Sequence, residues 1–419
     1  MTKPLAPTHA AAGFRRVLAA EVVSNFGTML SRLAIPWLAA ITLAATPWQM
    51  SALLMADVAA GALGALLLGA WVDRRPKRAT MVACDLLNVA VLSALALAAW
   101  QQRLSIPVLA AAAALSGLLT MTFELARSAW IAQAVPEPDL PRRNAQLSVG
   151  GSLSETAAFA AGGWLFQGLG AALSLAVDAL SYAVSAFALR GVREVPPVPA
   201  AADAPAAPGG AIAATLRDLR RGLAEVRRQP MLRRLAALEL LLGLSMALFS
   251  IGYLLYLSRE LQLGTGLQGM IIATGGLGSV LGGLLAVRAG QRLGSPRALA
   301  LGLLLAAAGS ACGPAAQGAG LVAVLLLVAH QVVGDGGMTV AQVHDRTLRQ
   351  TLVAPDLLAA VDGALRAVGQ VAMLAGALLA ATVATELGLR NALWLAAGLS
   401  LLAAVVAVAG RRADAQDAL

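Results

Sequence analysis

The feature that most constrains this chain is a series of apolar runs, each about 20 residues long, separated by short polar or charged segments. A run of this length crosses a bilayer as an α-helix, which satisfies its own backbone hydrogen bonds. At roughly 30 to 35 residues for each span and its connection, the 419 residues provide about twelve spans. Charged residues make up only 13% of the sequence, whereas soluble proteins carry about 25%. This composition excludes a water-soluble enzyme, a disordered protein and a disulfide scaffold.

We therefore predict an all-α membrane protein with twelve transmembrane helices in two pseudo-symmetric six-helix bundles. The predicted spans are residues 17–41, 49–72, 79–100, 105–130, 144–168, 171–190, 234–258, 266–287, 297–313, 319–341, 357–385 and 388–410.

The basic residues of the loops predict the orientation of the spans. If the N-terminus is cytoplasmic, the outer loops hold only Arg103, Arg259 and Arg390. Three further arginines lie inside spans, and the remaining 25 of the 31 basic residues fall on the cytoplasmic side. We expect a multi-pass protein of the cytoplasmic (inner) membrane with both termini inside.

The longest connection divides the chain into two halves. Residues 195–211 are rich in proline and alanine, which predicts a flexible linker. Residues 212–228 then carry apolar residues at helical spacing with arginines between them, which predicts a basic amphipathic helix on the membrane surface. A solvated charged helix is the alternative. The predicted parts are a six-helix bundle over 1–190, the linker and amphipathic helix over 191–233, and a second bundle over 234–419.

The two halves also repeat in sequence. Residues 61–74 and 275–288 align without a gap and share three glycines, two leucines and the final arginine. Two six-span repeats joined by a long loop indicate a substrate path between two bundles near the middle of the bilayer.

The segment between spans two and three, residues 69–78, resembles the loop pattern G-x-L-x-D-R-x-G-R-[RK] of the major facilitator superfamily. The second copy, at 283–297, has Val287 in place of the aspartate. A glycine lets helices approach closely, and an aspartate accepts charge-assisted hydrogen bonds. We predict a gating loop here that latches the two halves. The matching residues are Gly69, Asp73, Arg74, Lys77 and Arg78.

Further segments resemble the drug and siderophore exporter branch of that superfamily, which includes macrolide efflux proteins and the enterobactin exporter. They are Phe123–Ile131, Asn144–Ala145 and Val177–Tyr182. The resemblance implies twelve helices, alternating access and efflux, with the cavity lined mainly by spans 1, 4, 7 and 10. It departs from the branch at residues 157–163 and at Ala359–Ala360, where the expected glycine motifs are missing.

Charged residues inside spans are costly and therefore mark candidate functional positions. Their positions along the spans place Glu21, Glu124 and Arg127 in the inner third of the membrane. Glu155 lies on span five. Because burial disfavours a charged carboxyl and a nearby arginine favours it, this combination suits proton exchange. We predict Glu124 and Glu155 as the proton-coupling pair, with Arg127 as modulator and Glu21 next. Structural ion pairs are the alternative for each, and we expect purely structural roles for Asp85 and Asp178.

The substrate-binding candidates face the expected cavity. On span one, Asn25 and Arg32 follow Glu21 at helical spacing, and depth predicts that Arg32 pairs with Asp57 of span two. An apolar and aromatic stripe on span seven is the other candidate wall, although such a stripe also serves ordinary packing. The full set is Asn25, Arg32, Asp57, Met246, Phe249, Tyr253, Asp335 and Arg366.

No nucleotide-binding loop, hydrolase elbow or zinc-ligand spacing occurs in the sequence. We expect no enzyme, no metal and no cofactor, with a proton gradient as the energy source. The expected partners are a small-molecule substrate and the lipid bilayer, and no nucleic acid. We expect the protein to be a monomer. The favoured function is proton-coupled efflux of a small amphipathic compound. The alternatives are a lipid or lysolipid flippase of the same fold and a non-transporting membrane sensor or scaffold.

Overall fold

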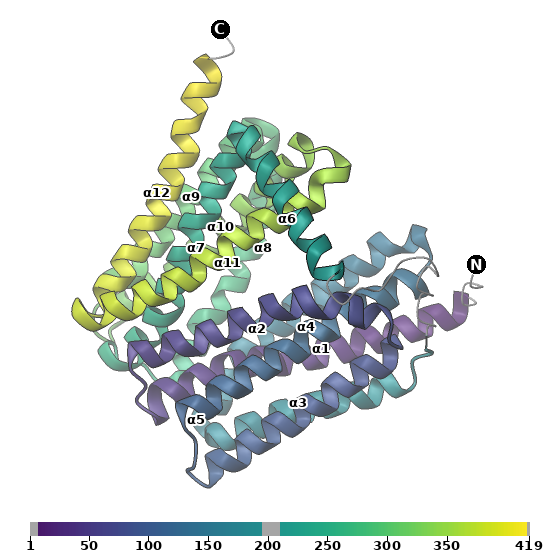
Figure 1. The fold of residues 1–419 in the computed structure, drawn as a ribbon. Coiled ribbons are helices and arrows are strands. Elements are labelled where there is room, and N and C mark those ends of the chain that lie inside the picture. The colour runs from purple at the N-terminus through teal and green to yellow at the C-terminus, as the bar shows by residue number, and fades with distance from the viewer. Residues whose placement is uncertain (1–6, 195–209, 417–419) are drawn as a thin grey trace. The chain divides into compact units, whose positions relative to one another are not determined.

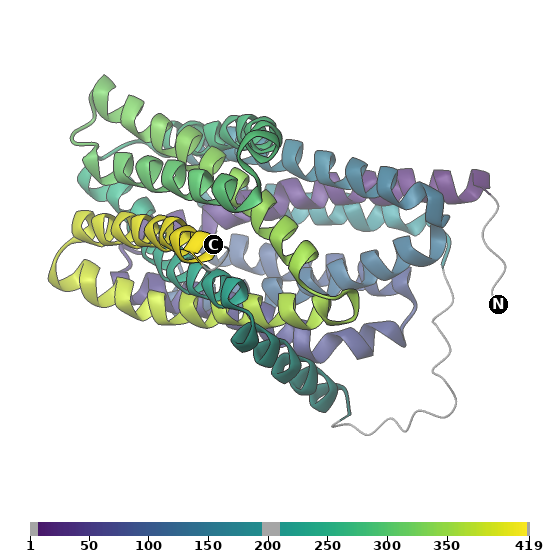
Figure 2. The ribbon, with the colours of Figure 1, turned by 90° about the horizontal axis from the view of Figure 1, so that it is seen from above.

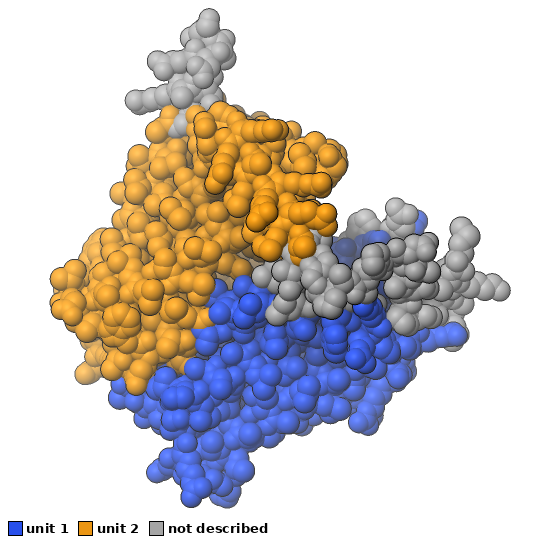
Figure 3. Space-filling model, in the orientation of Figure 1, with its two compact units in different colours: residues 1–44, 56–212 blue, residues 45–55, 213–419 orange. Residues whose placement is uncertain are grey.

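A computed structural model describes residues 7–194 and 210–416, and within these ranges the chain is helical, with no β-strand. The predicted linker at 195–209 lies outside the described residues. The chain divides into two compact units (Figure 3), which are described separately below. Unit 1 comprises residues 1–44 and 56–212, and unit 2 comprises residues 45–55 and 213–419.

Unit 1 is built from long apolar helices connected by short loops (Figure 1). Helix α2 begins in the segment 45–55, which is assigned to unit 2, and the rest of it belongs to unit 1. The helices are α1 (Pro7–Trp37), which continues as a short π-helix (Leu38–Thr42), α2 (Pro47–Asp73), α3 (Lys77–Trp100), α4 (Ile106–Ala134) and α5 (Leu140–Arg190).

The 51-residue helix α5 contains two spans separated by a break at Gly170. This glycine has φ of 76° and ψ of 176°, a backbone conformation that a residue with a side chain rarely adopts. The break lies between the predicted spans 144–168 and 171–190, so the sequence located both spans correctly. Helix α5 packs against both α1 and α3, which places its polar residues beside those of α1.

Unit 2 contains a further six long helices preceded by the shorter α6. The helices are α6 (Gly210–Arg228), α7 (Pro230–Leu255), which continues as a π-helix (Tyr256–Glu260), α8 (Thr265–Leu293), α9 (Ser295–Ala315), α10 (Leu321–Leu352), α11 (Pro355–Glu386) and α12 (Leu389–Gln416). Figure 2 shows the ribbon from above; within unit 2, α7 packs against α11 and α12, and α10 packs against α8 and α9.

Glycines allow the helices of unit 2 to approach very closely. A Cβ atom built on Gly278 of α8 would lie 2.4 Å from the carbonyl oxygen of Val332 on α10. One built on Gly282 would lie 2.2 Å from the carbonyl oxygen of Gly336. This backbone-to-backbone packing is typical of helices in membranes, where small residues line the interfaces.

Length and composition identify nine helices of the described residues as candidate membrane spans, with the two spans of α5 counted as one. Together with α1 and α2, the six spans of unit 1 and the six of unit 2 give the predicted all-α architecture of the major facilitator fold. Most helices extend beyond their predicted ends. The largest difference is at α10, which runs to Leu352 rather than ending near residue 341.

Candidate functional site

An ion pair connects the first and fourth spans of unit 1. Arg127 of α4 donates a hydrogen bond from Nη1 to Oε1 of Glu21 on α1. The two side chains are only 18% and 16% exposed. The neighbouring residues Ala20 and Ala126 belong to a buried apolar cluster that also contains Phe14 and Trp130. Because the pair is largely excluded from water and joins two helices, loss of either charge leaves a costly unpaired group.

A second group of charges lies on α1, α2 and α4. Arg32 of α1 interacts electrostatically with both Asp57 of α2 and Glu124 of α4. The Asp57 carboxylate lies against Gly117 of α4, whose Cβ atom would come within 3.0 Å of Oδ1. Among the described residues no direct salt bridge joins Arg32 to either acid. The predicted Arg32–Asp57 ion pair is thus not formed among the described side chains, although the charge of Arg32 acts on Asp57.

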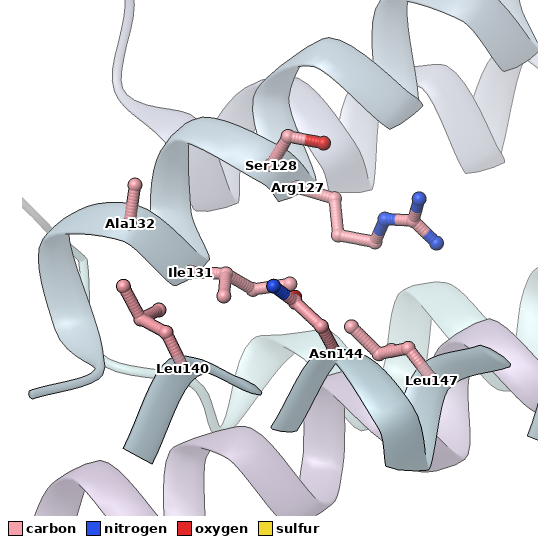
Figure 4. A pocket seen from close by; sticks show the side chains of 7 residues that line it. All are labelled: Arg127, Ser128, Ile131, Ala132, Leu140, Asn144 and Leu147. Carbon is pink, nitrogen blue, oxygen red and sulfur yellow. The ribbon is translucent and has the colours of Figure 1, made fainter. Parts of the chain in front are cut away.

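A cavity of about 290 Å³ lies between the C-terminal part of α4 and the first turns of α5 (Figure 4). Arg127, Ser128 and Asn144 are its polar lining residues, and the remaining lining is apolar. Figure 4 shows the side chain of Asn144 extending from α5 toward Ile131 of α4. Arg127 thus belongs both to the ion pair with Glu21 and to the wall of this cavity. Its Nε–H is buried and has no hydrogen-bond partner in the described part of the chain.

Two side-chain hydrogen bonds connect α1 and α5, and one of them uses the predicted residue Asn25. Asn25 donates a hydrogen bond of 3.1 Å from Nδ2 to the carbonyl oxygen of Gly151. Ser154 donates one of 2.6 Å to the carbonyl oxygen of Val22. Glu155 is the next residue of α5 and is exposed, and no contact between it and Glu124 is found among the described side chains.

The two buried aspartates have hydrogen-bond partners of their own. Ser185 donates to Asp85 at 2.7 Å, and both Ser31 and Ser181 donate to Asp178. Both aspartates are fully buried. These contacts agree with the structural roles expected for them.

Unit 2 contains a charge cluster that the sequence analysis did not identify. The guanidinium of Arg349 on α10 forms direct ion pairs with Glu239 of α7 and with Asp345, one turn earlier on α10. Asp362 of α11 lies 3.5 Å from Nη1 of the same arginine. The Arg349 side chain is only 11% exposed. Two signals were available: the i, i+4 spacing of Asp345 and Arg349, and the parallel with the Glu21 pair of unit 1.

The predicted aromatic wall of unit 2 forms a stack of three rings. The Phe249 ring lies 4.5 Å from that of Tyr253 and 4.6 Å from that of His330 on α10. His330 Nδ1 is 2.9 Å from the carbonyl oxygen of Gly309, which makes this histidine part of the packing. Tyr253 is buried, and its hydroxyl has no hydrogen-bond partner among the described residues. Met246 is 56% exposed and takes no part in the stack.

The remaining two substrate-binding candidates lie apart from this stack's centre. Asp335 of α10 is exposed, and its carboxylate lies so close to Gly275 of α8 that a side chain at 275 would clash with it. Its charge acts on Tyr253. Arg366 of α11 is exposed.

The predicted gating loop is anchored within unit 1. Lys77 is fully buried and donates to the carbonyl oxygens of Val72 at 2.7 Å and Arg75 at 3.1 Å. Arg78 forms a salt bridge of 3.7 Å with Glu194, which follows α5, and its backbone N–H donates to the same carboxylate at 2.9 Å. Arg74 is exposed, and the side-chain surroundings of Gly69 and Asp73 lie outside the described part of the chain.

The family model described as Major Facilitator Superfamily matches residues 17–251, more than half of the chain. The chain belongs to the Major Facilitator Superfamily. No curated protein sequence matches it.

Solved structures of superfamily-like transporters show the same fold. The nucleoside transporter NupG is similar with a TM-score of 0.75 and 13% identity, over 94% of this chain and 98% of that one. A bacterial homologue of the human lysosomal transporter Spinster, inward-facing and unoccupied, has a TM-score of 0.71 and 15% identity, over 96% and 97%. A bacterial homologue of the iron transporter ferroportin, also inward-facing, has a TM-score of 0.68 and 16% identity, over 94% and 98%.

This member of the Major Facilitator Superfamily is therefore a multi-pass membrane protein and a membrane transporter rather than an enzyme. Within the described residues, no group of three His, Cys, Asp or Glu side chains is placed to hold a metal ion. The chemistry available in its spans is that of carboxylates, arginines and one buried stack of rings.

Proposed function

We propose that the protein is a proton-coupled exporter of a small amphipathic compound that works by alternating access. The observation that carries the proposal is the Glu21–Arg127 ion pair, which joins two predicted spans beside a cavity, with a further carboxylate, the exposed Glu124, three residues before Arg127 on α4. A carboxylate in such a place exchanges its proton when the balance between burial and the neighbouring arginine changes. Resemblance to the drug and siderophore exporter branch favours efflux over uptake.

Proton movement is coupled to transport because the Glu21 carboxylate and an acceptor group of the substrate compete for Arg127. With Glu21 ionised, Arg127 is held by the ion pair. When an external proton neutralises Glu21 or Glu124, the arginine loses part of its compensating charge and becomes available to a substrate acceptor group. Substrate that enters from the cytoplasm then favours release of the proton inside. A ligand drives such a cycle only through its different affinity for the two conformations.

Arg32 supports a role for Glu124 in particular. The positive charge of Arg32 acts on both Glu124 and Asp57 and favours their ionised forms. Glu155 remains the predicted second member of the coupling pair, and the experiment below includes it.

The cavity and the ring stack support an amphipathic substrate. At about 290 Å³, the cavity is near the lower end of the usual range for small-molecule sites. Polar groups at Arg127, Ser128 and Asn144 and an apolar remainder suit a compound with one hydrogen-bonding end. Within unit 2, the rings of Phe249 and Tyr253 are a separate proposed contact for an apolar group.

We further propose that the protein is a monomer of the cytoplasmic membrane with both termini inside, powered by the proton gradient without a cofactor. The excess of arginine in the loops on one side supports this orientation.

The proposal is tested in two stages. Expression in a pump-deficient strain, with a panel of amphipathic antibiotics, dyes and siderophores, identifies a transported compound. Proteoliposomes loaded with that compound are then given a pH jump. We expect gradient-driven efflux that Glu124→Gln or Glu155→Gln abolishes and that Arg103→Gln, at an exposed position between α3 and α4, leaves intact.

The proposal is contradicted if the transport rate depends neither on the proton gradient nor on the two carboxylate substitutions. Phospholipid that moves between leaflets in the same vesicles, with no compound from the panel transported, favours the flippase instead. The sensor is favoured if the reconstituted protein transports nothing and its deletion in cells removes a cellular response.

A further inference from the structure

Helix α6 has two distinct faces. Its buried face contains Gly222 and Val226, with Leu219 and Leu223 half-buried beside them. These positions recur at the i, i+3, i+4 and i+7 spacing of one helix face. The sequence predicted an amphipathic helix here, and the structure shows where its apolar face lies.

That face is seated on α11 of the same unit. A Cβ atom on Gly222 would lie 2.0 Å from the carbonyl oxygen of Ala360, so the two backbones are in direct contact. Val226 belongs to the core of unit 2, together with Val361 of α11. At the end of α6, Gln229 donates a hydrogen bond of 3.4 Å to the carbonyl oxygen of Leu352, the last residue of α10. Helix α6 is thus attached to the protein and not only to the membrane surface.

The opposite face carries five arginines. At 100° per residue they fall within an arc of about 120°, and the two acids of the helix, Asp218 and Glu225, lie beyond one edge of that arc. Leu216, which is 46% exposed, lies at the other edge. All five side chains are exposed: Arg217, Arg220, Arg221, Arg227 and Arg228.

We propose that this arginine face of α6 binds the anionic phospholipid headgroups of the leaflet next to it, while Gly222 holds the helix on α11. Guanidinium groups form bidentate hydrogen bonds with phosphate, and five of them on one face create a strong local excess of positive charge. The exposed Leu216 beside the arginines favours a bilayer over a soluble anion, because an apolar side chain gains from entering the acyl boundary. The α7 span begins at Pro230, which places α6 at the membrane surface.

The test uses the full-length protein with a nitroxide on Ala224→Cys in a Cys84→Ala, Cys312→Ala background. Ala224 is exposed and lies within the arginine arc. Spin-label accessibility to a water-soluble nickel chelate is measured in vesicles of phosphatidylcholine, alone or with increasing phosphatidylglycerol. We expect phosphatidylglycerol to protect the label, and about 0.5 M salt to weaken that protection by screening.

A charge-matched pair of variants separates local binding from the net charge of the protein. Arg217→Gln, Arg220→Gln and Arg221→Gln together should weaken the preference for phosphatidylglycerol by roughly a hundredfold, since each arginine contributes a factor of roughly five. The control removes three exposed arginines elsewhere in unit 2, at the end of α8 and the start of α9, and should leave the protection unchanged. It combines Arg288→Gln, Arg292→Gln and Arg297→Gln.

Protection that depends on phosphatidylglycerol and is lost only in the α6 variant supports the inference. Equal accessibility in both lipids overturns it, as does equal loss of protection in the two triple variants. A label that is protected only by an added acidic protein and not by lipid also overturns it and indicates a soluble partner. The measurement requires no substrate, so it is independent of the proposed efflux function.

Discussion

The two units each link their first and fourth spans with a glutamate–arginine pair, but the surroundings of the two pairs differ. In unit 1, Glu21 is the carboxylate that contacts Arg127 directly. In unit 2, Arg349 contacts Glu239 and also has Asp345 and Asp362 around it. The first pair is balanced in charge, whereas the second arginine is outnumbered by acids. The first and fourth spans of the two units therefore carry one pair that the gain of a single proton by its carboxylate would break, and one arginine that would keep two other acidic partners.

The largest effect is expected from Arg349→Gln. It leaves three carboxylates close together without their shared cation, and breaking a buried ion pair in this way costs about 3–5 kcal/mol. The apparent midpoint of thermal unfolding in detergent should fall by several degrees. The loss should shrink as the pH falls, because protonation removes the repulsion among the acids.

Arg366→Gln, on α11, is the matched control, and its apparent midpoint of thermal unfolding should equal that of the wild-type protein. If the two variants unfold at the same temperature at neutral pH, Arg349 does not hold the cluster together.

Comparison of Glu21→Gln with Glu239→Gln tests the asymmetry directly. Glu21→Gln removes the direct carboxylate partner of Arg127 and should cost about 2–3 kcal/mol. Glu239→Gln leaves Arg349 with two acids and should cost about 1 kcal/mol or less. Thermal unfolding of the two variants side by side measures the difference. Equal losses of stability would show that Asp345 and Asp362 do not compensate for the missing Glu239 carboxylate.

A double variant sharpens the unit 1 side of the comparison. If Glu21 and Arg127 act on each other, Glu21→Gln combined with Arg127→Gln should cost less than the sum of the two single changes, by about 1–3 kcal/mol. Additive losses would mean that the contact contributes nothing to stability.

The smallest effect is expected from Asp362→Asn. This carboxylate is 45% exposed and lies 3.5 Å from Arg349, so its contribution should stay below about 1 kcal/mol. A change as large as that of Arg349→Gln would instead make Asp362 the main partner of the arginine.

The long apolar runs made most of the fold predictable. Their length set the number of spans, and Gly170 separated the fifth from the sixth at the expected place. The end of α10 was predicted less well, because its last turns carry Asp345 and Arg349, which composition alone assigns to a loop. Within the helix, Arg349 forms ion pairs with both Asp345 and Glu239, which offsets part of the cost of burying these charges.

The candidate site was predicted only in part, because the sequence indicates the depth of a residue along its span but not the direction of its side chain. Depth along the spans brought Glu21 near Arg127 and Arg32 near Asp57, since both depend only on the rise per residue. Which way a side chain points around its helix depends on packing partners far away in the sequence. Depth therefore did not predict that Asn25 bonds to Gly151, or that Met246 lies outside the ring stack while Tyr253 is buried within it.

The most direct test of the account is proton release on substrate binding by the purified protein in weakly buffered detergent, with a compound identified by the efflux panel. We predict that the wild-type protein releases protons, that Glu124→Gln releases far fewer, and that Asp362→Asn releases as many as the wild type. Equal release from wild type and Glu124→Gln, or no release from any of the three, would contradict proton coupling through the acids of unit 1.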